Sequence, residues 1–132
     1  MNISKNFKLH EFVDSYTAIR WRINNNPPAT VIENIKIFCN DLLQPLRDHY
    51  GKPMYINSGY RCKKLNQMVG GVETSFHRKG FAADIRCQSP KDLLNSLITS
   101  GLDFDQAILY PTFLHIGYNP EEGSNRRQII RK

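Results

Sequence analysis

The chain has 132 residues, of which 40% are hydrophobic and 23% are charged, and this predicts one soluble globular domain over residues 1–132. It has no apolar run near the ~20 residues of a membrane-spanning helix and no apolar core of a signal peptide at residues 1–7. The 18 Lys and Arg exceed the 12 Asp and Glu by six, and the resulting charge of +6 favours an anionic partner such as nucleic acid, a membrane surface or a cell-wall polymer.

The first third of the chain is predicted to be helical. Residues 7–16 are expected to form a short helical turn or loop, and the Asn-Asn-Asn-Pro-Pro run at 24–28 is expected to break any regular secondary structure. Thr30 and Glu33 have the spacing of a capping box, and hydrophobic residues then recur at a helical period. Pro45 falls inside this pattern, so we expect the helix to kink or restart there.

The rest of the chain alternates strands and helices. Short helices are expected at 61–68 and from Ser89 to Gly101, where serine and proline begin the second helix and glycine ends it. Strands are expected at 54–58, 82–86, 105–110 and 113–118. This order predicts an α+β fold in which a small antiparallel or mixed sheet of about four strands has helices packed on one face.

Three residues stand out as potential metal ligands: His77, Asp84 and His115. Residues alternate between the two faces of a strand, so Asp84 and His115 can point to one polar face while their neighbours point to the core. Two imidazoles and one carboxylate leave the fourth position of a tetrahedral zinc ion open, as in catalytic sites. The alternative is a hydrogen-bonded cluster that holds the sheet and a loop together.

An ordered set of motifs resembles the M15 peptidase family, in particular its small single-domain members from phages and prophages. The motifs are SGYR (58–61), LN (65–66), VGG (69–71), SFH (75–77), GFAADI (80–85) and FLHI (113–116). The family includes zinc D-alanyl-D-alanine carboxypeptidases and phage endolysin endopeptidases. The resemblance implies an α+β domain of the Hedgehog and DD-peptidase type.

The resemblance also implies roles for individual residues. His77, Asp84 and His115 would hold Zn²⁺, which lowers the pKa of bound water to about 7 and polarises a carbonyl. Arg61 would be catalytic, stabilising the oxyanion or binding a substrate carboxylate, and Ser75 would lie on the substrate side. The alternatives are that Arg61 forms a salt bridge with Asp84 and that Ser75 caps a loop.

The chain departs from the family pattern at one position. Members place a carboxylate shortly before the last histidine as general base, but residues 109–114 contain no acid. Asp105 is the nearest acid upstream, but it falls on the Asp-Gln pair that starts the strand in family members. The residues that could stand in are Glu73, Glu121 and Glu122, with Tyr110 as a hydrogen-bond donor to an oxyanion.

We therefore expect a zinc-dependent peptidase that hydrolyses peptidoglycan stem peptides as a carboxypeptidase or endopeptidase. The alternatives are a non-catalytic zinc module that binds cell wall or serves in a phage particle, and a basic nucleic-acid binder. We expect a monomer whose partner is the peptidoglycan peptide, with no membrane or nucleic-acid partner.

The three cysteines, Cys39, Cys62 and Cys87, cannot all pair and show no CxxC spacing. This favours free thiols in a reducing compartment, with a single Cys62–Cys87 bridge as the alternative. We expect the protein to be cytoplasmic as synthesised and to act on the cell wall after release or delivery.

Overall fold

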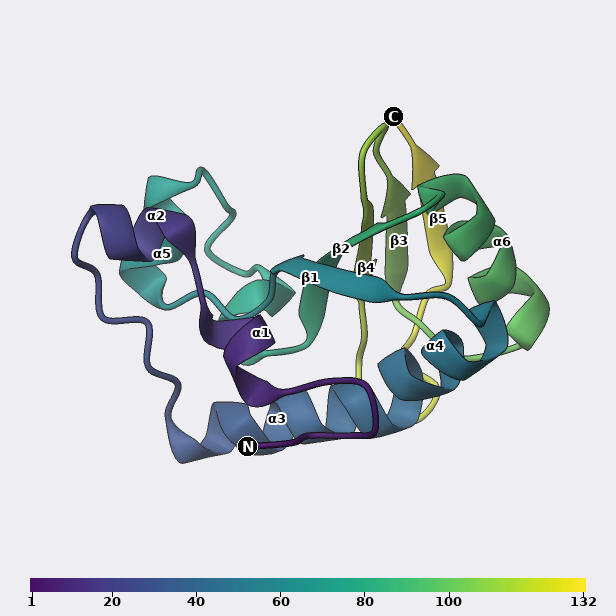
Figure 1. Cartoon of the computed structure of the whole chain (residues 1–132), viewed down its shortest axis with the longest axis horizontal. Helices are drawn as coiled ribbons and strands as arrows, with labels where there is room; N and C mark the ends of the chain where they lie inside the picture. Colours follow the sequence, from purple (N-terminus) through teal and green to yellow (C-terminus); the bar gives the residue numbers. More distant parts are fainter.

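A five-stranded mixed sheet forms the centre of the protein, with strand order β1-β2-β4-β3-β5 (Figure 1). The computed structural model describes residues 1–132. The strands are β1 (Met54–Ser58), β2 (Ala82–Cys87), β3 (Gln106–Leu109), β4 (Leu114–Gly117) and β5 (Gln128–Arg131). Neighbouring strands pair antiparallel except for β3 and β5, which are parallel. The α+β fold with a mixed sheet is confirmed, but the basic C-terminal segment adds a fifth strand at the sheet edge.

The structure also has six α-helices, together with a π-helical and a 3₁₀ segment. They are α1 (Leu9–Val13), α2 (Tyr16–Arg20), α3 (Ala29–Phe38), η1 (Cys39–Leu43), α4 (Gln44–Tyr50), α5 (Lys63–Met68), η2 (Phe76–Lys79) and α6 (Pro90–Ser100). Figure 1 shows α2 and α5 at one end of the molecule and α4 and α6 at the other. The predicted helix at 61–68 and the predicted helix from Ser89 to Gly101 are both present.

The expected restart of the long helix at Pro45 is confirmed, because α4 begins at Gln44 with Pro45 in its first turn. Residues Cys39–Leu43 form a π-helical turn, and the Gln44 amide donates to the Cys39 carbonyl five residues back. Pro45 has no N–H to continue a regular ladder and is accommodated at the start of α4. The predicted capping box of Thr30 is wrong: α3 begins at Ala29, after Pro28, and no side chain caps it.

The hydrophobic core lies between the sheet and α3, η1, α4 and α6. It is one cluster of 23 buried residues that includes Ile35, Phe38, Ile85, Leu94 and Leu114. Because side chains alternate along β2 and β4, the neighbours of Asp84 and His115 enter this core. Asp84 and His115 themselves therefore face away from it.

No helix in the structure has the length and apolar character needed to cross a membrane. Cys39, Cys62 and Cys87 are all free thiols, so the alternative Cys62–Cys87 bridge is not formed. Burial raises the pKa of the Cys39 thiol strongly, with the charge of Glu11 adding to the effect, so this cysteine is a packing residue rather than a nucleophile.

Candidate metal centre

The structure brings His77, Asp84 and His115 together. Asp84 on β2 and His115 on β4 are direct partners in the antiparallel register, and η2 brings His77 to the same side. Asp84 Oδ1 lies 2.8 Å from His115 Nδ1 and 3.4 Å from His77 Nε2. One potential ligating atom from each residue lies within 4.8 Å of the other two. Three donors can thus converge on one ion.

Backbone contacts hold the His77 ring in place. The ring is 4% exposed, and its Nδ1 lies 2.7 Å from the carbonyl oxygen of Gly59. Since a carbonyl can only accept, Nδ1 donates its hydrogen to Gly59, and Nε2 faces Asp84 as the nitrogen that would bind an ion in place of a proton. Ser75 caps η2, because its Oγ accepts the His77 amide hydrogen at 3.2 Å. The loop-cap alternative for Ser75 is therefore formed in the structure.

The two oxygens of Asp84 serve different partners. Oδ1 faces the two histidines, whereas Oδ2 accepts from the Arg61 guanidinium at 3.3 Å. Burial alone would raise the pKa of Asp84, but the hydrogen bonds from His115 and His77 and the charges of both rings hold it well below its usual range. Asp84 is therefore an ionised, hard oxygen donor at neutral pH.

Arg61 is fixed by side chains around the end of β1. Its Nε donates to Ser58 Oγ at 3.1 Å, and one Nη lies 3.5 Å from Asn66 Oδ1. The salt bridge with Asp84 that we considered as an alternative is formed. Burial lowers the pKa of Arg61, partly offset by Asp84, and the group stays charged. Three of its five N–H groups are used in these contacts, so two remain for a ligand.

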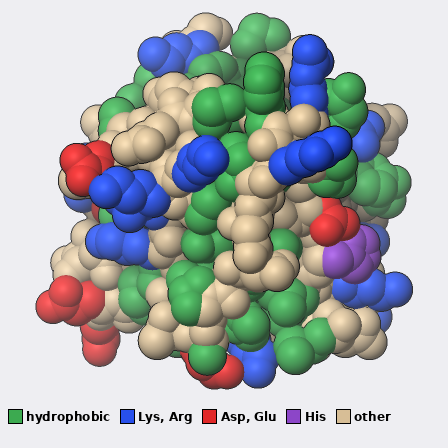
Figure 2. Space-filling view, turned by 90° about the vertical axis from the view of Figure 1, so that its left-hand side faces the viewer, with side chains coloured by type: hydrophobic (Ala, Val, Ile, Leu, Met, Phe, Trp, Pro, Cys, Tyr) green, Lys and Arg blue, Asp and Glu red, His purple; other side chains and the backbone are tan.

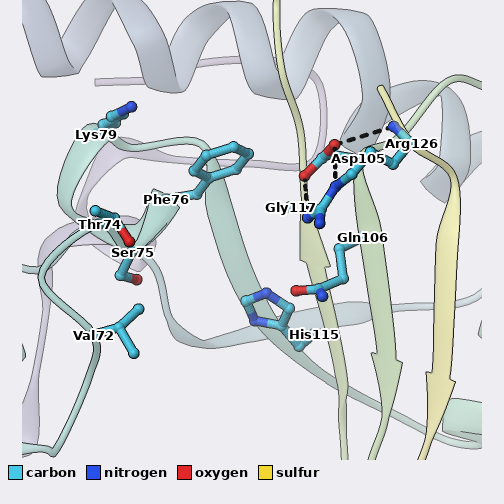
Figure 3. A pocket seen from close by; sticks show the side chains of 10 residues that line it. All are labelled: Val72, Thr74, Ser75, Phe76, Lys79, Asp105, Gln106, His115, Gly117 and Arg126. Atoms are coloured by element: carbon cyan, nitrogen blue, oxygen red, sulfur yellow. Dashed lines mark hydrogen bonds and ion pairs between the residues drawn. The ribbon is translucent and has the colours of Figure 1, made fainter. Parts of the chain in front are cut away.

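Two open hollows lie near the three residues, one reaching His115 and the other reaching Arg61. One, of about 430 Å³, is lined by His115, Ser75, Phe76 and Gln106 and by residues further from the centre (Figure 3). The other, of about 230 Å³, is lined by Arg61 together with residues of α2 and α5. Figure 2 shows the end of the molecule with α2 and α5, where hydrophobic side chains lie between Lys and Arg side chains. The hollow lined by His115 gives a ligand direct access to the centre.

No further carboxylate belongs to the group of ligating atoms. Asp105 is buried and paired with Arg126 through two side-chain bonds of 3.1 and 2.9 Å. Glu73, Glu121 and Glu122 are all exposed. Tyr110 stacks on Phe113 at 4.4 Å between ring centroids, in the β3–β4 turn. The acid missing from residues 109–114 is therefore not replaced by another carboxylate among the ligating atoms.

Some residues of the site were missed by the sequence analysis. Asn66, which the sequence marks only as part of the LN motif, is buried and contacts Arg61. Gly59 orients His77 through its carbonyl group, which no side-chain pattern reveals. Arg126, in the basic segment before β5, lines the larger hollow with His115. The signals for Gly59 and Asn66 were the SGYR and LN motifs, and the signal for Arg126 was the Asn-Arg-Arg-Gln-Ile segment at 125–129, which also resembles the small phage-type members.

An α+β domain with a two-histidine, one-carboxylate centre on the open face of its sheet fits the class of metal-dependent hydrolases. The model of the Peptidase M15 family matches residues 5–116. The chain therefore belongs to the M15 peptidase family. No curated protein matches the chain in sequence.

Proposed function

We propose that the protein is a zinc-dependent peptidase that hydrolyses peptidoglycan stem peptides. The observation that carries this proposal is the convergence of His77, Asp84 and His115 within 4.8 Å in a chain of the M15 family. The charge of +6 supports an anionic substrate, and stem peptides carry carboxylates.

The donor set fits zinc. His77 offers Nε2 because its other nitrogen is bonded to Gly59, and Asp84 offers an ionised oxygen whose partner oxygen is held by Arg61. Nitrogen and oxygen donors in this combination are those of catalytic zinc sites with one position open. Zinc bound there would supply a Lewis acid that activates water and polarises the scissile carbonyl.

The protein's own residues would position the peptide. Arg61 keeps two N–H groups free beside the centre, and these can bind the oxygen on which negative charge develops. The hydroxyl hydrogen of Ser75 is free to donate, because the cap uses only the oxygen as an acceptor. The hollow lined by His115 and Ser75 leaves room for a residue of the peptide next to the centre.

The test is cleavage of defined peptidoglycan fragments of several chemotypes by the zinc-loaded protein, with products identified by mass spectrometry. We expect new fragments with the wild type, loss of these products with a chelator, and recovery when zinc is restored. The product masses name the bond.

His77→Ala and His49→Ala form a matched pair for this test. His49 is exposed on α4 and bonds only Thr99, so its loss leaves the centre intact. His77→Ala should abolish cleavage and His49→Ala should not. Undiminished cleavage by His77→Ala would refute the mechanism.

A second candidate function is a non-catalytic zinc module that binds cell-wall peptide. It is favoured by the acid-free segment before His115 and by the engagement of Asp105 with Arg126. This candidate predicts zinc binding and retention on peptidoglycan without product fragments. Metal-dependent hydrolysis of any fragment would exclude it.

A further inference from the structure

We infer that the hollow beside His115 is an anion-selective subsite in which Arg126 binds a carboxylate of the substrate peptide. This inference rests on the proposed function for the nature of the peptide. It adds a specificity-determining residue that lies outside the motif-bearing segment, between β4 and β5.

Asp105 holds the Arg126 side chain in one orientation. The carboxylate accepts from the Arg126 amide at 3.1 Å, from Nε at 3.1 Å and from Nη2 at 2.9 Å. Asp105 is only 4% exposed, and its own backbone bonds Gly117 and Gln128, so it is anchored to β4 and β5. A surface arginine is normally mobile, and this one is preorganised by a buried partner.

The held guanidinium points into the hollow. Figure 3 shows it lying above Gln106 and directed toward the side of His115, whereas the carboxylate of Asp105 is turned to Arg126. Nε and Nη2 bond Asp105, so the remaining nitrogen, Nη1, keeps both of its hydrogens free. These can donate to an incoming oxygen.

The charges lining the hollow favour an anion. Arg126 and Lys79 are its two cationic residues, and Asp105, with both oxygens already engaged, is its one acid. Lys79 lies on the opposite wall, with its ammonium group 5.4 Å from the centre of the Phe76 ring. Arg126, Lys79 and Asp105 together give the lining one net positive charge. The hollow has a volume of about 430 Å³, which is enough for an amino-acid side chain.

A carboxylate suits this site better than its amide. It accepts charge-assisted hydrogen bonds from arginine, whereas a carboxamide carries no charge and brings two donors that meet no free acceptor carboxylate here. We therefore expect the protein to prefer a peptide with a free carboxylate next to the scissile bond over the amidated peptide by about 10- to 100-fold in kcat/KM.

The experiment uses pairs of stem-peptide fragments that differ only in a carboxylate or its carboxamide, with each acidic position varied in turn. Wild type should prefer the acid at one position, and Arg126→Gln should reduce that ratio to near one. Arg127→Gln is the matched control, because Arg127 bonds the Leu102 carbonyl and packs on Phe104, and it does not line the hollow. It should keep the wild-type ratio. Equal rates on acid and amide at every position, or a preference that persists in Arg126→Gln, would overturn the inference.

Binding to the metal-free protein separates this inference from the proposed function. Calorimetric titration with the same fragments should show the same acid preference and its loss in Arg126→Gln. If no fragment is cleaved by the zinc-loaded protein, the proposed function fails, and the binding ratio still decides the inference. If Arg126→Gln does not fold, the Asp105→Asn, Arg126→Gln double variant, which replaces the ion pair with an amide pair, is measured instead, together with Lys79→Gln. Binding ratios unchanged from wild type in both would refute the subsite.

Discussion

Asp84 links the metal centre to the charged residue beside it. One oxygen faces His77 and His115 and the other faces Arg61, so a single carboxylate orders both a set of metal ligands and a cationic donor. Arg61 also donates to Ser58 Oγ and, over a longer distance, to Asn66 Oδ1. The salt bridge and a substrate-side role are therefore compatible in one side chain.

Arg61→Lys tests that double role. Lysine keeps the positive charge beside Asp84 but loses the planar fork that reaches Ser58 and Asp84 together. We expect unchanged zinc stoichiometry and a fall in kcat on the order of 100-fold, the usual effect of losing a donor to a developing oxyanion. Steady-state kinetics with a cleaved fragment measures it.

The control is Arg78→Lys. Arg78 directly follows His77, and its guanidinium donates only to the Glu73 carbonyl. It should behave as wild type. A wild-type kcat in Arg61→Lys would show that the charge alone suffices and that the fork has no catalytic part.

At the scale of elements, the end of β1 organises the site. The β1–β2 register shifts between Ile56 and Ser58, and the chain then turns at Gly59 to bring Arg61 toward Asp84. Gly59 packs against α1 so closely that an added Cβ would lie 2.7 Å from Phe12 Cα and 2.8 Å from its carbonyl oxygen. The same residue accepts the His77 Nδ1 hydrogen. Gly59 therefore both packs against α1 and orients the His77 ring.

Gly59→Ala should therefore affect both stability and metal binding. The new methyl group collides with backbone, so we expect a loss of about 1–3 kcal/mol in the free energy of unfolding. Displacing the Gly59 carbonyl should weaken zinc binding by about 10- to 100-fold. Urea unfolding and zinc titration measure the two effects.

Gly51→Ala is the comparison, because Gly51 has φ of 76° with open space at its Cβ. It should cost about 1–2 kcal/mol in backbone strain and leave zinc affinity unchanged. If Gly59→Ala lost stability but bound zinc like wild type, its carbonyl would have no positioning role.

The sequence was most informative where a pattern has one structural meaning. Strand alternation placed Asp84 and His115 on one face, and the structure pairs them directly. The sequence was least informative where the local structure depends on backbone hydrogen bonding rather than on side-chain pattern. The π-helical turn at Cys39–Leu43 depends on how the helical hydrogen bonds adapt to Pro45, which has no N–H group. The segments α2 and η2 are single turns, which are too short to show a hydrophobic period. The pairing of β5 with β3 joins segments some 20 residues apart through an edge that no local pattern marks.

At the scale of the whole molecule, buried carboxylates make the fold sensitive to acid. Hydrogen bonds from Arg126 outweigh burial and lower the pKa of Asp105, and the two histidines lower that of Asp84 against the effect of burial. A lowered folded-state pKa contributes stability that is present above the unfolded value of about 3.9 and is lost as pH falls through the folded value. We expect the metal-free protein to lose stability steeply below about pH 4.

Asp105→Asn should flatten this loss, because the asparagine cannot be protonated in the same range. The variant starts less stable at neutral pH, since it gives up the ion pair with Arg126. Urea unfolding of the metal-free protein between pH 2 and 7 measures both effects. Asp103→Asn, at an exposed position near Arg127, should keep the wild-type slope. Parallel pH profiles for Asp105→Asn and wild type would contradict this assignment.

The metal centre is tested most directly by calorimetric titration of the metal-free protein with zinc, for wild type and for His77→Ala, Asp84→Ala and His115→Ala. We predict one zinc per wild-type chain and at least a 100-fold loss of affinity in each variant, because each removes one of three ligands. His49→Ala should match wild type. Wild-type affinity in any of the three variants, or no zinc bound by the wild type, would contradict the centre on which the proposed function depends.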